Sequence, residues 1–222
     1  MTPKGFFRRI SILLEQARSP YMLTGSFASS VYGMGRGSPD VDFVIGSDEE
    51  GVRTLLSQLS EADFSSNLNQ ALDACRKRST FNIVDNICGL KIDFIFLRDR
   101  EFSRVEFERR TKVQVWSVPL YMATPEEVGL STLEWTKLRP YGRQIEDAAG
   151  ILKVRRDQLD LPYIEKWVRR TRTNSPVAPG PPARWHRSEL TRGERPFLDH
   201  YLQFPGQEAY LVMLGRSQGR IA

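Results

Sequence analysis

Two aspartates separated by one residue, Asp40 and Asp42, are the side chains of this chain best suited to chemistry. They follow a glycine-rich loop at residues 33–39 and stand at the start of residues 41–45, whose alternation predicts a strand. Residues i and i+2 of a strand face the same side, so both carboxylates should point at one spot. Adjacent anions repel unless a cation lies between them, and an all-oxygen ligand set favours Mg²⁺ or Mn²⁺.

A third carboxylate, Asp93, interrupts the apolar segment KIDFIF at residues 91–96. A lone aspartate in a buried strand is costly unless it is paired or binds a metal. If this strand neighbours the strand of the first two aspartates, three carboxylates converge, as two-metal phosphoryl transfer requires. A salt bridge from Asp93 to Lys91 or to an arginine is the alternative interpretation.

A Gly-Ser turn, Gly25 and Ser26, lies between a predicted strand at residues 21–23 and a predicted helix at residues 27–32. Glycine lets the backbone come close to a phosphate, and the N–H groups at the helix start and the serine hydroxyl can donate to phosphate oxygens. Arg36, in the following loop, would add a cation over the phosphates. The alternative is a plain turn with a solvated arginine.

The elements that must position these residues fall into two halves. The first half alternates predicted helices and strands; helices are expected at 5–18, 27–32, 49–59, 68–78 and 101–110, and strands at 21–23, 41–45, 81–84, 90–97, 113–116 and 120–123. The second half is helical, with helices expected at 125–138, 141–154 and 160–171. Its start carries a capping box, with Thr124 as N-cap, Pro125 at the first helical position and Glu127 completing the box.

The segment LTGSFASSVYGMGRGSPDVDFVI at residues 23–45, together with the later Asp93, resembles the signature of the nucleotidyltransferase superfamily with the DNA polymerase β-like fold. More closely, the chain is similar to small bacterial nucleotidyltransferases related to the AbiEii/MenT-type toxin group. The similarity extends to FSRVEFERR at residues 102–110 and through residues 123–170. It implies an α/β (α+β) fold with a small mixed sheet and a helical subdomain, and domains at residues 1–123 (catalytic), 124–172 (helical) and 173–222 (tail).

The same resemblance implies an activity: transfer of a nucleoside monophosphate from an NTP to an acceptor hydroxyl, dependent on Mg²⁺ or Mn²⁺. By its motifs, Gly25 and Ser26 fall on the phosphate-binding turn, Asp40 and Asp42 on the metal ligands, and Asp93 on the third carboxylate. Asp93 would also help to deprotonate or orient the acceptor.

In the helical half, the related toxins pair a lysine with a downstream aspartate that lies near the nucleotide. Asp147 matches the aspartate, whereas Thr132 stands where the lysine is expected. Lys137, more than a helical turn later, would replace that lysine only in part. A helix-surface role is the alternative for both Lys137 and Asp147.

Three classes of function stay open. The chain is a toxin that modifies tRNA and has an antitoxin partner, a transferase that modifies a protein or a small molecule, or a non-catalytic nucleotide-binding or antitoxin-partner module. Thr132 favours the last class. The sequence does not specify the base of the nucleotide or the oligomeric state.

The charge distribution separates the last quarter of the chain from the rest. The chain of 222 residues has a net charge of +5. Residues 169–222 hold nine arginines and four acids, so they account for all of this positive charge. This Pro- and Arg-rich tail predicts a solvated, disordered segment, with binding to nucleic acid phosphates as the alternative.

The remaining composition excludes a membrane protein and a disulfide-rich secreted protein. There is no run of 18 apolar residues, and the N-terminal apolar residues have helical spacing instead of the pattern of a secretory signal. Two cysteines, Cys75 and Cys88, are too few for a disulfide framework and lack metal-ligand spacing. We therefore expect a protein of the reducing cytoplasm, with both cysteines as buried fillers.

Overall fold

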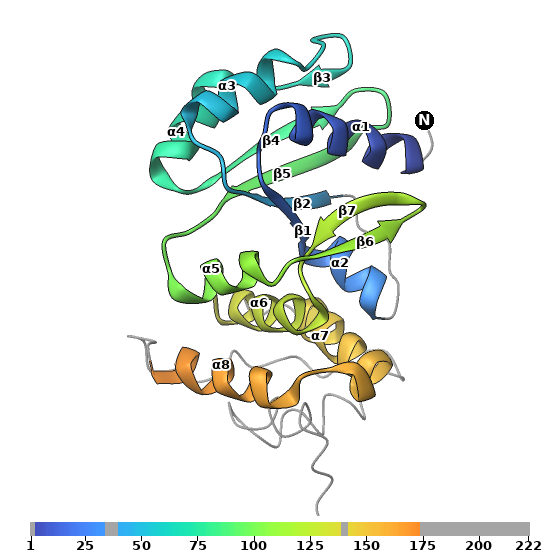
Figure 1. The fold of residues 1–222 in the computed structure, drawn as a ribbon, viewed down its shortest axis with the longest axis vertical. Coiled ribbons are helices and arrows are strands. Elements are labelled where there is room, and N and C mark those ends of the chain that lie inside the picture. Colours follow the sequence, from blue (N-terminus) through green and yellow to red (C-terminus); the bar gives the residue numbers. More distant parts are fainter. Residues whose placement is uncertain (1–2, 34–39, 139–141, 174–222) are drawn as a thin grey trace, which may run out of the picture. The chain divides into compact units, whose positions relative to one another are not determined.

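The structure is a computed structural model that describes residues 3–33, 40–138 and 142–173 (Figure 1). The chain divides into two compact units, Met1–Leu159 and Asp160–Ala222. The first unit holds the sheet and most of the helices, and the second holds one described helix. The domain boundaries at 123/124 and 172/173 stay predictions, and the predicted tail lies outside the described residues.

Helices and strands are mixed in the first unit up to Met122, and helices alone follow, as the sequence predicted. Its helices are α1 (Pro3–Gln16), α2 (Gly25–Tyr32), α3 (Glu49–Ser57), α4 (Leu68–Lys77), α5 (Glu101–Glu108), α6 (Pro125–Leu138), α7 (Gly142–Arg155) and a short 3₁₀ turn η1 (Arg156–Gln158). Its strands are β1 (Tyr21–Thr24), β2 (Asp40–Ile45), β3 (Phe64–Ser65), β4 (Thr80–Asp85), β5 (Leu90–Phe96), β6 (Thr111–Val115) and β7 (Val118–Met122). β3 and η1 were not predicted from the sequence, because both are too short to show a period.

The strands form one mixed sheet of seven strands in the order β3-β4-β5-β2-β1-β7-β6. β2 pairs with β5 in parallel, and β1 pairs with β7 in parallel, whereas the other neighbours are antiparallel. The central strands therefore come from distant parts of the chain. This arrangement confirms the predicted α/β (α+β) class with a mixed sheet.

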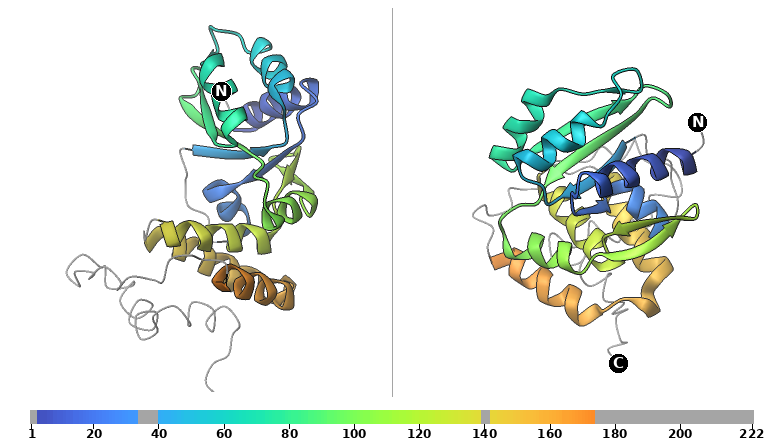
Figure 2. Two further views of the ribbon diagram at one scale, coloured as in Figure 1. Left: turned by 90° about the vertical axis from the view of Figure 1, so that its left-hand side faces the viewer. Right: turned by 45° about the horizontal axis from the view of Figure 1, so that its top comes forward.

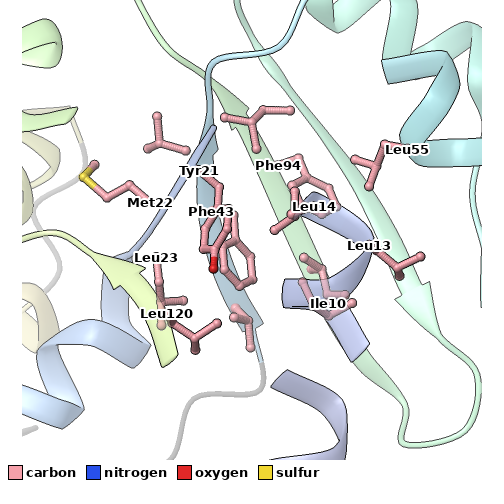
Figure 3. Close-up of a cluster of buried hydrophobic side chains, with 14 of the residues drawn as sticks. Ile10, Leu13, Leu14, Tyr21, Met22, Leu23, Phe43, Leu55, Phe94 and Leu120 are labelled. Atoms are coloured by element: carbon pink, nitrogen blue, oxygen red, sulfur yellow. The ribbon is translucent and has the colours of Figure 1, made fainter. Parts of the chain in front are cut away.

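One face of the sheet carries the apolar core. Register partners on neighbouring strands share a face, and Leu23, Phe43, Phe94 and Phe81 form such a row, each almost fully buried. Helices α1 and α3 lay apolar side chains against this row, as Figure 3 shows for Ile10, Leu13, Leu14 and Leu55. The Phe43 and Phe81 rings each stack on Phe94, at 6.0 and 5.2 Å. Burial of these side chains is the main stabilising term of this layer.

Helix α2 packs with α6 and α7 and contacts the end of β2 (Figures 1 and 2). The C-terminal end of α2 is held closely by α7. A Cβ on Gly33 would lie 2.9 Å from the Ile151 nitrogen, so the two backbones touch. Nε of Arg155 donates to the Tyr32 carbonyl at 3.2 Å, and a cation at a helix C-terminus is favourable.

The β6–β7 hairpin has a two-residue turn, Trp116–Ser117, with φ of 47° and 63°. Both residues occupy the left-handed region that such turns require and that non-glycine residues rarely adopt. Trp116 is 51% exposed, and its ring lies 5.6 Å from Phe7 and 5.8 Å from Phe27. These aromatic contacts offset the backbone strain of the turn.

The second unit begins with Asp160 and contains α8 (Leu161–Thr173). The Asp160 carboxylate accepts from the Tyr163 N–H at 3.0 Å, which caps the helix. Arg170 lies 5.4 Å from the Trp167 ring.

No helix among the described residues is long and apolar enough to cross a membrane.

Helices α5 and α6 bury a group of carboxylates. α6 begins at Pro125, so Thr124 stands at the predicted N-cap position, and its carbonyl accepts from the Val128 N–H. The Thr124 hydroxyl contacts the carboxylates of Glu126 and Glu127. Glu127 is fully buried and accepts from Nε of Arg109 at 2.7 Å. Glu106 of α5 is only 6% exposed. Burial raises the pKa of Glu106 to about 8, which Arg100 opposes and the Glu127 and Glu134 carboxylates reinforce.

Glu106 therefore makes stability depend on pH. Because its pKa in the folded protein lies above the unfolded value of 4.5, the folded chain binds more protons between about pH 4.5 and about pH 8. The free energy of unfolding should fall as pH rises through that window. Glu106→Gln should remove this loss. In urea denaturation, the free energy of unfolding of the variant should therefore exceed that of the parent by an amount that grows from pH 5 to pH 8. Exposed Glu108→Gln is the control, and an advantage that is equal at both pH values would contradict the assignment.

Candidate active site

The second face of the sheet carries the charged residues. Asp42 and Asp93 are direct partners across the parallel β2–β5 pair. Asp40 and Lys91, two residues earlier on the same strands, are also partners and lie on the same face. The row through Asp42 continues to Thr24 on β1 and, on the other side, through Asp93 to Asn82 on β4. The structure thus brings the three sequence-predicted aspartates to one face, on two adjacent strands.

The charges on this face are unevenly compensated. Lys91 places its Nζ 2.9 Å from Oδ2 of Asp93 and 3.9 Å from Oδ1 of Asp40. Burial raises the pKa of Asp42 to about 6, and the carboxylates of Asp93 and Asp40 add to the shift, which Lys91 opposes. Among the residues that the structure describes, three anions and one cation share this patch, so a further cation would be stabilised here.

Gly25 has a steric role at this site that the sequence did not reveal. Its φ is +69°, and a Cβ at this position would lie 2.0 Å from Oδ2 of Asp42. Only glycine lets the backbone turn from β1 into α2 in contact with that carboxylate. The close approach of a phosphate to Gly25 stays a prediction; the close neighbour within the protein is the Asp42 side chain.

The start of α2 faces the same carboxylate. Thr24 occupies the N-cap position, and in the described part of the chain its side chain makes no capping hydrogen bond to the helix. Ser26 is half-buried in the first turn. The first N–H groups of a helix have no intrahelical acceptor and carry a partial positive charge, which favours an anion. The predicted phosphate-binding turn thus adjoins the predicted metal ligands.

The residues present fit a divalent metal ion. Their donor atoms are carboxylate oxygens, the ligands of Mg²⁺ and Mn²⁺, and the excess of negative charge around Asp42 fits a cation. Within residues 3–33, 40–138 and 142–173, no three acidic, histidine or cysteine side chains form a group that could hold one ion. Mg²⁺ commonly binds one or two carboxylates and takes its other ligands from water and substrate phosphates.

The other predicted site residues are only partly covered by the structure. Arg36 lies outside the described residues, and so does the side chain of Lys137, although its backbone belongs to α6. Thr132 lies in the same helix and is partly buried. Asp147 lies in α7 and is 9% exposed. Their proximity to a nucleotide stays a prediction.

Two residues of the site escaped the sequence analysis. Thr24 and Asn82 share the row of Asp42 and Asp93, because β1 and β4 flank the two aspartate strands. Asn82 is exposed and Thr24 is buried. Both polar residues lie on strands that the sequence predicts or directly after one. Their alignment with the aspartates could not be predicted, because it depends on pairing between strands that are distant in the sequence.

The contact between Gly25 and Asp42 can be tested with alanine. Gly25→Ala adds both an unfavourable backbone conformation, worth about 1–2 kcal/mol, and a clash with the carboxylate. Gly89→Ala is a matched control, since Gly89 has φ +71° with open space around its Cβ position. Thermal or urea denaturation should show a larger loss of stability for Gly25→Ala. Equal losses would contradict the close approach.

Burial, reinforced by the neighbouring carboxylates, should make an ionised Asp42 costly for the stability of the metal-free protein. Its folded pKa, about 6, lies above the unfolded 3.8, so stability falls as pH rises between these values. With EDTA present, Asp42→Asn should unfold at higher urea than the parent at pH 7, and the difference should vanish below about pH 4. Asp99→Asn, whose side chain is 88% exposed, is the control. A variant less stable than the parent at pH 7 would refute this account.

Comparison with known proteins gives the fold a context. One similar solved structure is ANT(2'')-Ia in complex with adenylyl-2''-tobramycin, at 11% identity and a TM-score of 0.51 over 76% of this chain and 96% of that chain. Lincomycin-bound lincosamide antibiotic adenylyltransferase LnuA matches at 13% identity and a TM-score of 0.46, over 68% and 98%. An antigenic nucleotidyltransferase-like protein from Paracoccidioides brasiliensis matches at 14% identity and a TM-score of 0.46, over 77% of this chain and 88% of that chain. No family model and no curated protein matches the sequence. The chain has the nucleotidyltransferase fold.

Proposed function

We propose that this chain is an NTP-dependent nucleotidyltransferase that moves a nucleoside monophosphate to an acceptor hydroxyl with the help of Mg²⁺ or Mn²⁺. One observation carries the proposal: Asp42 and Asp93 are partners on parallel strands, and the glycine turn into α2 touches the Asp42 carboxylate. Metal ligands and a phosphate-binding helix start are thus adjacent, as transfer from a triphosphate requires. The nucleotidyltransferase fold supports the same activity.

The chain's own groups would bind the substrate as follows. The N–H groups at the start of α2 and the Ser26 hydroxyl donate to phosphate oxygens of the NTP. Asp40 and Asp42 would hold the metal, and Asp93, beside Asp42, would orient the acceptor hydroxyl or accept its proton. Arg36, Lys137 and Asp147 are proposed as further nucleotide contacts from the loop and the helical half.

The reaction is an in-line displacement at the α-phosphorus. The acceptor oxygen forms a bond to that phosphorus, the bond to the bridging oxygen between the α- and β-phosphorus breaks, and pyrophosphate leaves. The hydroxyl proton passes to a carboxylate of the site or to water. When bound, the divalent ion supplies charge neutralisation on the phosphates and activates the attacking oxygen.

The acceptor divides the proposal into classes. A small-molecule hydroxyl is one class, since the similar structure of ANT(2'')-Ia contains adenylylated tobramycin. The resemblance to AbiEii/MenT-type proteins adds tRNA, with the chain as a cytoplasmic toxin held by an antitoxin, and a protein is the third class. The free thiols of Cys75 and Cys88 are compatible with a reducing compartment.

The decisive experiment incubates the protein with each α-labelled NTP, Mg²⁺ or Mn²⁺, and separate pools of RNA, protein and small molecules. We expect label on one pool, abolished by EDTA. Asp42→Asn and Asp93→Asn should each lower transfer at least ~100-fold. The first change removes a proposed metal ligand, and the second removes the carboxylate that would orient or deprotonate the acceptor; each loss costs several kcal/mol of transition-state stabilisation. Asp73→Asn, an exposed aspartate of α4, should transfer at the parental rate.

Each outcome of this experiment is informative. The pool that carries label identifies the acceptor class, and label dependent on one NTP identifies the base. Metal-dependent NTP binding without transfer to any pool would contradict the enzyme proposal. That result would favour the non-catalytic module to which Thr132, in place of the expected lysine, points.

A further inference from the structure

Lys91 lies among the proposed metal ligands, on the same face of the sheet. It precedes Asp93 by two residues on β5, and it is the register partner of Asp40 on β2. Its Nζ is 2.9 Å from Oδ2 of Asp93, which is hydrogen-bonding distance, and 3.9 Å from Oδ1 of Asp40. One ammonium therefore bridges carboxylates on two strands.

This ammonium and a divalent ion require the same oxygen atoms. Each carboxylate oxygen that accepts from Lys91 is a ligand position for Mg²⁺ or Mn²⁺. The lysine side chain is 41% exposed and the Asp40 side chain 45% exposed, so the flexible amine has room to leave toward solvent. Metal binding would replace one cation by another, and a lysine that stayed would repel the ion.

We propose that Lys91 is a displaceable counter-ion, which neutralises the aspartates when no metal is bound and competes with the divalent ion for them. It thereby raises the metal concentration at which the site fills. The inference rests on the proposed metal-dependent function and adds a residue that sets its metal requirement. The competition depends on the positive charge at position 91, so an arginine there should compete with the divalent ion as the lysine does.

The test measures Mn²⁺ binding to the full-length protein by isothermal titration calorimetry and by the shift in melting temperature. Lys91→Met should lower the Mn²⁺ dissociation constant about 3- to 10-fold, the scale of one partly exposed ion pair. Lys91→Arg should stay near the parental value. Lys77→Met is the matched control, because Lys77 forms an exposed pair with Asp73 at 2.7 Å on α4, outside the charged row.

The outcomes separate this inference from the function on which it rests. Unchanged or weaker Mn²⁺ binding by Lys91→Met, with binding by the parent intact, would overturn the counter-ion role and leave the transferase proposal standing. If Lys91→Arg lowered the Mn²⁺ dissociation constant as much as Lys91→Met, the counter-ion role would also be overturned. Absence of Mn²⁺ binding by the parent and by both Lys91 variants would overturn the counter-ion role and the metal-dependent function together. Lys91→Gln repeats the test if the methionine variant fails to fold.

Discussion

The parallel pairing of β2 with β5 is the constraint on which the rest of the structure depends. Once Phe43 is aligned with Phe94, the strand alternation places every second residue of both strands in the core. The residues in between, Asp42 and Asp93 among them, must then share the opposite face. A slip of one residue would move the aspartates into the core and the phenylalanines out of it. The same hydrophobic burial that stabilises the sheet therefore forces like charges together.

Helix α2 extends this constraint into the second layer. Its first residue, Gly25, touches the Asp42 carboxylate, and the carbonyl of its last residue, Tyr32, accepts from Arg155 at the end of α7. The close approach of Gly33 to Ile151 leaves little room for the helix to move along α7. The turn next to the aspartates is thus positioned by two separate parts of the fold, the sheet and the helical half of the chain.

Local patterns in the sequence predicted the elements and the chemistry of the site, but not the contacts between distant segments. The spacing of Asp40 and Asp42 was enough to place both on one strand face, and apolar periodicity located most helices and strands. The salt bridge between Lys91 and Asp93 was one of the alternatives that the sequence offered, and the structure contains it. Which strand would lie beside the two aspartates depended on core packing far along the chain, so the contact of Lys91 with Asp40 could not be derived. Burial of Glu106 was equally hidden, because its helix is rich in charged residues and shows no sign of which acid faces inward.

The strained turn of the β6–β7 hairpin has an optical consequence. Its half-exposed indole, Trp116, lies against Phe27, and Phe27 directly follows the Gly25–Ser26 turn in α2. The emission wavelength of an indole depends on the polarity around it. Any rearrangement of the first turn of α2 would change the surroundings of this ring, so the chain carries its own fluorescent reporter beside the segment that adjoins the aspartates.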